Sequence, residues 1–179
     1  MKHFLIVVDM QKDFVDGALG TPEAVAIVPA AVRKIETFDG TIFVTMDTHD
    51  AGYLSTAEGK KLPVPHCIRG TDGWQLDKRI ASALEKKPCI TVEKKTFGSV
   101  DLPAKILEAA EGEAFTLELI GLCTDICVVS NALLLKAWFP EAAVSVDAAC
   151  CAGVTPALHE AALRTMESCQ IVICRAKPE

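Results

Sequence analysis

Long apolar runs and an excess of positive charge are both missing from this sequence. A membrane-spanning helix needs about 20 consecutive apolar residues, and no run approaches that length. The apolar run from Phe4 to Val8 is too short for the core of a signal peptide. The 18 basic and 24 acidic residues give a formal net charge of -6, the wrong sign for binding a phosphate backbone or an anionic membrane. We therefore expect a cytoplasmic protein with no nucleic-acid or membrane partner.

No two cysteines have the C-x-x-C spacing, although the chain contains eight cysteines. This absence argues against a zinc ribbon and against a thioredoxin-like redox motif. Eight is an even number, but the lack of an export signal favours reduced thiols over a disulfide framework. Most of the eight are expected to be small core residues.

Short apolar runs alternate with helix-length stretches along the whole chain. At 179 residues we expect one domain, spanning residues 1–179. The expected strands are 4–8, 41–45, 89–92, 115–120 and 143–146, with 171–173 as a candidate sixth, and the expected helices are 22–37, 76–84, 103–110, 125–139 and 156–168. Such alternation predicts a three-layer α/β/α fold with a mostly parallel six-stranded sheet.

Two features refine this prediction. Thr21 and Thr155 each precede a proline, which places a capping hydroxyl before the first helical position.

The segment 47–73 has no sustained periodicity and contains several glycines and prolines. Long irregular segments inside compact domains are commonly functional.

Several chemically active residues follow the predicted strands, where ligands bind in a parallel sheet. Asp9 follows the first strand and Lys94 the third. Cys127 falls in the first turn of the helix after the fourth strand, with Thr124 or Asp125 as the expected cap. A helix N-terminus stabilises a thiolate, so Cys127 is a candidate nucleophile. Taken singly, each residue also has a structural explanation. Asp9 could be a carboxylate in a turn, Lys94 a solvated surface lysine and Cys127 a buried structural thiol. Their convergence at one sheet edge favours function.

A candidate metal site lies at the start of the irregular segment. Asp47 and His49 are two residues apart where the second strand ends, so an extended backbone points both side chains the same way. His66 completes a set of one carboxylate and two imidazoles, which is typical of a catalytic or substrate-binding metal. The alternative is two unrelated surface histidines. His159 is expected on a helix surface and His3 in solvent.

Five segments resemble, in order, the motifs of the isochorismatase-like cysteine hydrolases. They are VVDMQKDF at 7–14, which matches the family's D-x-Q-x-D-F motif, DTH at 47–49, LPVPHCIRGT at 62–71, KKTF at 94–97 and GLCTDICV at 121–128. The resemblance implies an Asp-Lys-Cys triad at Asp9, Lys94 and Cys127. It also assigns Asp47, His49 and His66 to the metal site of the nicotinamidase branch. That branch converts nicotinamide to nicotinate and ammonia, whereas isochorismatases proper generally lack the cysteine and the metal ligands.

The same resemblance implies further details of the site. The backbone amides of Cys123 and Cys127 would form the oxyanion hole, and a non-proline cis peptide would fall at Leu122–Cys123. Phe14 is the motif-matched apolar wall for a pyridine ring, while Trp74 is either a second wall or ordinary core. One divalent metal ion is expected, zinc or else manganese or iron, with Glu58 rather than Tyr53 as an additional ligand. A homo-oligomer is expected.

One departure from the family pattern and two rival functions accompany this assignment. Gly98-Ser99-Val100 stands where many relatives have Ser-Ala-Phe, so this wall of the pocket differs. The first rival is a related cysteine amidohydrolase acting on another small amide, carbamoyl or ureido compound. The second is a non-catalytic metal-binding or thiol redox-sensing protein.

Overall fold

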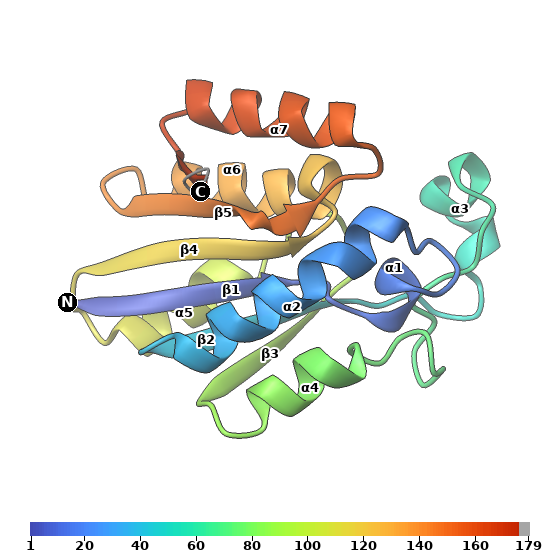
Figure 1. Ribbon diagram of the computed structural model, residues 1–179, viewed down its shortest axis with the longest axis horizontal. Coiled ribbons are helices and arrows are strands. Elements are labelled where there is room, and N and C mark those ends of the chain that lie inside the picture. The colour runs from blue at the N-terminus through green and yellow to red at the C-terminus, as the bar shows by residue number, and fades with distance from the viewer. Residues whose placement is uncertain (176–179) are drawn as a thin grey trace.

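Six parallel strands form one central sheet, and helices cover both of its faces (Figure 1). The computed structural model describes residues 1–175, so residues 176–179 of the expected domain lie outside the described part. The strand order is β3-β2-β1-β4-β5-β6, with every neighbouring pair parallel. The strands are β1 (Lys2–Val8), β2 (Thr41–Asp47), β3 (Cys89–Lys94), β4 (Phe115–Leu122), β5 (Ala143–Ala152) and β6 (Val172–Cys174). The predicted fold class is confirmed.

The helices divide between the two faces of the sheet. They are α1 (Lys12–Val15), α2 (Pro22–Thr37), α3 (Ala57–Lys61), α4 (Lys78–Leu84), α5 (Leu102–Ala110), α6 (Val129–Trp138) and α7 (Pro156–Ser168). Side chains of α1, α2 and α4 pack in one core cluster, and those of α5, α6 and α7 in the other. Successive strand side chains point to opposite faces, so Leu5 and Val7 of β1 join the first cluster while Phe4, Ile6 and Val8 join the second.

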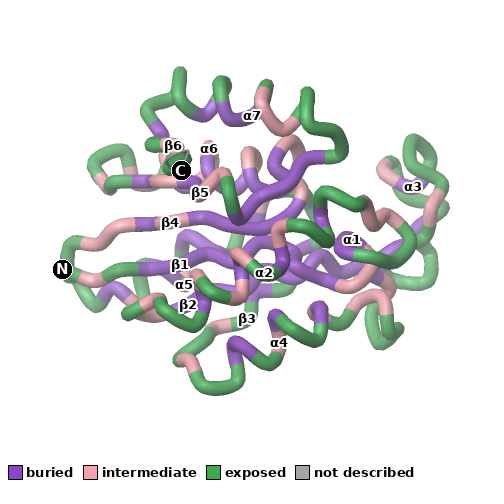
Figure 2. The backbone as a smooth tube through the Cα atoms, in the orientation of Figure 1, coloured by how far each residue is buried: buried purple, intermediate pink, exposed green. Residues whose placement is uncertain are grey.

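The helix starts follow the capping chemistry of the sequence. Thr21 accepts a hydrogen bond from the amide of Ala24, and Thr155 accepts one from Leu158, which confirms both predicted caps. The helix expected from residue 76 begins instead at Lys78, because Asp77 caps its first turn by accepting from the Arg79 amide. The short helix α1 was not predicted. The irregular segment contains a 3-10 turn at Tyr53–Ser55 and the largely exposed α3 (Figure 2).

Gly121 allows β4 to lie close to β1 near the carboxyl edge of the sheet. Its φ of +121° belongs to a region that L residues rarely adopt, and a Cβ there would lie 2.1 Å from the carbonyl oxygen of Val8. Only glycine fits without a backbone shift. Among the described residues, no helix is both long and apolar enough to cross a membrane.

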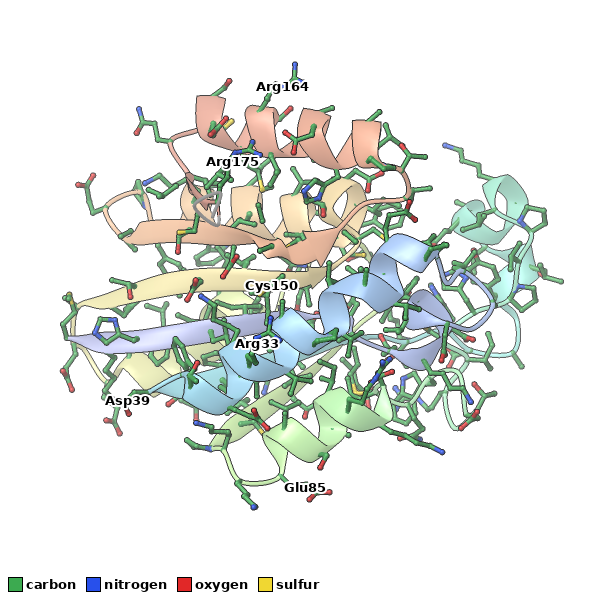
Figure 3. The ribbon with its side chains drawn as sticks, in the orientation of Figure 1. Arg33, Asp39, Glu85, Cys150, Arg164 and Arg175 are labelled. Carbon is green, nitrogen blue, oxygen red and sulfur yellow. The ribbon has the colours of Figure 1, made fainter. Side chains whose placement is uncertain are left out.

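All eight cysteines lie in the described part of the chain, and all are free thiols. Half of them are buried, whereas Cys89, Cys169 and Cys174 are exposed, so the expectation that most are core residues holds only in part. Cys150, labelled in Figure 3, packs in the core cluster shared by β5 and α2.

Candidate active site and metal site

The carboxyl edge of the sheet, at the right of Figure 1, brings the predicted chemical residues together. Asp9 directly follows β1, Asp47 and Lys94 are the last residues of β2 and β3, and Cys127 follows β4. The register makes Asp47 and Lys94 direct neighbours on adjacent strands. Their clustering therefore follows from strand pairing and not from closeness in sequence.

Asp9, Lys94 and Cys127 form a compact buried group. The Nζ atom of Lys94 lies 2.7 Å from Oδ2 of Asp9 and 3.5 Å from Sγ of Cys127. These three residues are 0%, 4% and 5% exposed, respectively. A carboxylate, an ammonium and a thiol are thus held in contact where water cannot screen them, as acid-base chemistry at sulfur requires.

Burial decides the protonation of this group. Burial raises the pKa of Asp9, although the ammonium of Lys94 opposes the shift. Burial and the nearby Asp9 carboxylate raise the pKa of the Cys127 thiol well above its usual range. Burial disfavours the charge on Lys94, but Asp9, Cys127 and Asp47 outweigh it and raise its pKa. These shifts favour the neutral thiol of Cys127 over the thiolate, despite its place at a helix end.

Cys127 lies in a widened helical turn. Residues Thr124–Val128 form a π-helical turn ahead of α6, in which the amide of Val128 donates to the carbonyl of Cys123 at 3.1 Å. The prediction that Thr124 or Asp125 caps this helix is wrong, because Cys123 is the N-cap and no side chain caps the turn.

Both expected caps bond to other segments because the residues after β5 pack against this turn. The hydroxyl of Thr124 lies 2.8 Å from Nδ1 of His159, and Asp125 accepts from the amide of Val154. His159 is therefore half-buried rather than on an open helix surface, while His3 is exposed as expected. The expected cis peptide is present at Leu122–Cys123.

Two polar residues that the sequence analysis did not single out hold this group in place. Thr45, which is fully buried on β2, donates its hydroxyl proton to Oδ1 of Asp9 at 2.7 Å. Gln11 binds both backbone groups of Asp47, accepting from its amide at 2.7 Å and donating to its carbonyl at 2.9 Å. Gln11 belongs to the D-x-Q-x-D-F motif, whose presence was the available signal; Thr45 carried none.

The aspartate of the same motif supports the neighbouring loop. Asp13 accepts a hydrogen bond from the amide of Cys67 at 2.8 Å, next to His66. A Cβ at Gly73 would lie 2.2 Å from the same carboxylate, so the loop packs tightly there. Motif residues without a chemical role thus position the residues that have one.

Asp47, His49 and His66 bring their ligand atoms within 4.8 Å of one another. Oδ2 of Asp47 lies 3.0 Å from Nε2 of His49 and 3.6 Å from Nε2 of His66. Oε1 of Glu58 lies 3.7 Å from both of these nitrogens. Nδ1 of His66 bonds to the carbonyl of Val64 at 2.8 Å, which leaves its Nε2 directed at the group.

These donors fit a divalent cation. Tetrahedral zinc with ligands at about 2.1 Å places its donor atoms about 3.4 Å apart, close to the 3.0 to 3.7 Å separations found here. The buried Nε2 of His49 has no hydrogen-bond partner of acceptable geometry, and a cation would satisfy it. Burial favours a neutral Asp47, but the two adjacent histidines and the charge of Lys94 hold its pKa well below the usual range.

A cavity of about 240 Å³ joins the thiol to the metal residues. Its wall includes Cys127, Asp47, Glu58 and His66, and most of the remaining wall is apolar. Phe14 lines it, as predicted, and its ring centroid is 5.5 Å from that of His66. No lysine or arginine is among the described residues that line the cavity.

Two aromatic residues outside the cavity have structural positions. Trp74 does not line it, and its indole N–H donates to Thr48. Tyr53 donates its hydroxyl proton to the carbonyl of Leu62 and packs its ring against His49. An outer groove of about 740 Å³, lined by His49, Glu58, Lys61, Leu62 and Phe97 among others, adjoins the cavity.

The sequence of this chain is similar to those of known proteins. The model of the Isochorismatase domain matches residues 3–177. A curated relative, described as the uncharacterized isochorismatase family protein PncA of Bacillus subtilis (strain 168), is 33% identical over 146 residues, 74% of this chain and 78% of that protein.

Solved structures give the same result. The crystal structure of the nicotinamidase/pyrazinamidase PncA from Bacillus subtilis has a TM-score of 0.83 at 29% identity, covering 97% of this chain and 100% of that one. The pyrazinamidase of Pyrococcus horikoshii in complex with zinc has a TM-score of 0.76 at 28% identity, covering 98% and 99% of the two chains. Because the domain match takes in nearly the whole chain and these structures share its fold, the chain belongs to the isochorismatase family of hydrolases, in its nicotinamidase branch.

Proposed function

We propose that this chain hydrolyses nicotinamide to nicotinate and ammonia through a thioester on Cys127. The observation that carries the proposal is the cavity, which presents the thiol, a metal-binding group and an apolar wall to one small ligand. The similarity to solved nicotinamidase structures supports the same substrate.

Asp9 is the general base and acid of this proposal. Its carboxylate takes the thiol proton of Cys127, and the sulfur attacks the amide carbon to give a tetrahedral anion. The C–N bond then breaks as Asp9 returns the proton to nitrogen, so that ammonia leaves and a thioester remains. Water attacks the thioester, Asp9 accepts the water proton and returns it to sulfur, and the acid is released. Lys94, at 2.7 Å from Asp9 and 3.5 Å from Cys127, stabilises the anionic states of both.

The backbone amides of Cys123 and Cys127 are the proposed oxyanion hole. Each preorganised donor of this kind contributes roughly 3 to 4 kcal/mol in the transition state of other acyl-transfer enzymes. The widened turn that starts after Cys123 places both residues on the wall of the cavity.

Asp47, His49 and His66, with Glu58 as an additional ligand, are the proposed metal ligands. A divalent metal held there, zinc or else manganese or iron, would bind the pyridine nitrogen and orient the ring. Phe14, which lines the cavity, is the proposed apolar wall for the pyridine ring. The chain thus positions the two ends of the substrate separately. The ring would lie at the metal group and the amide at the sulfur of Cys127.

The charge of the cavity favours a neutral substrate over a carboxylate. Carbamoyl amino acids and isochorismate carry a carboxylate, which needs a cationic partner when it leaves water. No lysine or arginine is among the described residues of the lining, and its two acidic residues, Asp47 and Glu58, are proposed metal ligands, so no cationic side chain is available to a substrate carboxylate. A neutral ring amide fits this lining without an unpaired charge.

A substrate panel with matched pairs tests the proposal. Ammonia release is measured for nicotinamide, benzamide and an N-carbamoyl amino acid, with metal-replete and with chelated protein. We expect turnover of nicotinamide, weaker turnover of benzamide because it lacks the ring nitrogen, and none of the carbamoyl acid. Equal rates for nicotinamide and benzamide would exclude the metal–ring contact, and release from the carbamoyl acid alone would exclude the substrate. No release from any amide would favour a binding or sensing protein.

A further inference from the structure

Asn131 is a fully buried polar residue that the proposed mechanism does not use. It lies one turn after Cys127, in α6, and is 0% exposed. Its Nδ2 donates to the carbonyl of Cys127 at 2.8 Å and to the carbonyl of Phe97 at 3.1 Å, and its Oδ1 accepts from the amide of Ser99 at 2.9 Å. One side chain therefore connects the backbone of the nucleophile to two points of the segment after β3.

The chemistry of the three partners fixes the orientation of this amide. A backbone N–H only donates and a carbonyl only accepts, so Oδ1 must face Ser99 and Nδ2 must face the two carbonyls. Both hydrogens of Nδ2 are used. A buried amide with its bonds satisfied in this way holds its neighbours in one arrangement.

Phe97 makes this connection relevant to substrate binding. Its side chain lines the cavity with Cys127 and also lines the outer groove, and it remains 47% exposed. Residues 95–100 form neither helix nor strand. The distance between this aromatic wall and the thiol therefore depends on side-chain contacts, and Asn131 bridges the two directly.

We propose that Asn131 is a positioning residue that sets the separation of Phe97 from the Cys127 sulfur and so favours flat ring amides. The proposal depends on the proposed function for the identity of its substrate. The positioning role itself does not depend on that function, because any reagent with an aromatic ring that reaches Cys127 meets the same Phe97 side chain.

Three variants separate positioning from stability. Asn131→Ala removes all three hydrogen bonds. Asn131→Thr retains the bond to Cys127, because a helical threonine bonds the carbonyl four residues earlier, but loses both bonds to the Phe97–Ser99 segment. Leu135→Ala is the matched control: Leu135 is fully buried one turn further along α6, in the core cluster.

The first measurement compares two alkylating agents at Cys127. Iodoacetamide and N-benzyl iodoacetamide share one electrophile and differ by a ring, and mass spectrometry follows the Cys127 peptide. We expect the ratio of benzyl to parent rate to fall about tenfold in Asn131→Ala and Asn131→Thr, and to stay unchanged in Leu135→Ala. An unchanged ratio in Asn131→Thr overturns the proposal, even where Asn131→Ala fails to fold.

The second measurement is a double-mutant cycle with Phe97→Ala, using KM and kcat for nicotinamide. A positioning role predicts that Asn131→Thr raises KM about tenfold with a smaller change in kcat, and that it has little further effect once the Phe97 ring is absent. Additive effects, or the same KM increase in Leu135→Ala, would show a purely structural role. If the unsubstituted protein releases no ammonia from nicotinamide, the proposed function fails, while the alkylation ratio still decides the role of Asn131.

Discussion

Replacing Thr45 by valine is expected to shift the acid limb of the pH profile of kcat/KM to higher pH. Thr45 is fully buried, and its hydroxyl donates to Oδ1 of Asp9 at 2.7 Å. Asp9, as the proposed base, must be ionised to accept a proton. Its pKa is already raised by burial, and the bonds from Lys94 and Thr45 oppose that shift. Valine keeps the shape of threonine but removes the donor, so the ionised carboxylate loses support and its pKa rises further.

The size of the shift follows from the bond that is lost. A hydrogen bond to a charged group contributes about 1.5 to 3 kcal/mol, and one pKa unit corresponds to about 1.36 kcal/mol. The upper limit is therefore about two units. Because Lys94 remains at 2.7 Å and compensates in part, we expect a shift of about one unit. Activity above the new pKa should change little, and activity below it should fall about tenfold relative to the parent.

The assay is ammonia release from nicotinamide, with kcat/KM measured from about pH 4 to about pH 9. Thr116→Val is the control, because Thr116 lies toward the amino end of β4 and bonds His3. The control should leave the acid limb in place. An unmoved limb in Thr45→Val with an intact fold would refute the assignment of Asp9 as the base, and an equal shift in Thr116→Val would show an unspecific effect.

Four further substitutions test the nucleophile and its base, the metal group and the sheet edge. Cys127→Ala should abolish ammonia release with little change in the thermal midpoint, and Asp9→Asn should slow release by about 10² to 10⁴; an active Cys127→Ala protein would exclude the thioester. His66→Ala, like chelation, should raise KM for nicotinamide at least about tenfold but leave benzamide nearly unaffected, since it removes one proposed metal ligand; equal effects on both amides would contradict this. Gly121→Ala should destabilise the fold by about 3 kcal/mol or more, because its Cβ would lie 2.1 Å from the Val8 carbonyl; a thermal melt with an unchanged midpoint would contradict the close approach.

The sequence predicted those parts of the site that depend on strand ends and on charged or nucleophilic residue types. Asp9, Lys94 and Cys127 were found because parallel strands deliver their last residues to one edge. The candidate metal donors were predicted because Asp47 and His49 lie two residues apart at a strand end and because His66 is a residue type that binds metals. The order and pairing of the strands then bring these residues into contact. An apolar pattern predicts where a strand lies in the sequence more reliably than it predicts which strands pair with it.

The polar support of the site was not predictable by the same reasoning. Thr45 and Asn131 have residue types that are common in cores and loops, and each makes a hydrogen bond to a partner more than 30 positions away that the sequence does not indicate. The cap of the helix after β4 was mispredicted for a related reason. Thr124 and Asp125 are good capping residues locally, but His159 and Val154, 35 and 29 positions further along the chain, compete for their side chains. Tertiary contacts override a local preference that is worth about 1 kcal/mol.

Lys94 couples the two halves of the site, which determines how substitutions there should be interpreted. Its ammonium lies 2.7 Å from Asp9 and 3.4 Å from Asp47, because the register of β2 and β3 pairs Asp47 with Lys94. Removing the Asp47 carboxylate would therefore change the charge around the base and the thiol as well as the metal group. His66 has no such contact with Lys94 or Asp9 among the described interactions. Its Nε2 atom approaches only Asp47 and Glu58 among the charged residues that the structure describes. A change in KM without a change in kcat is consequently interpretable at His66, whereas at Asp47 the two effects would be mixed.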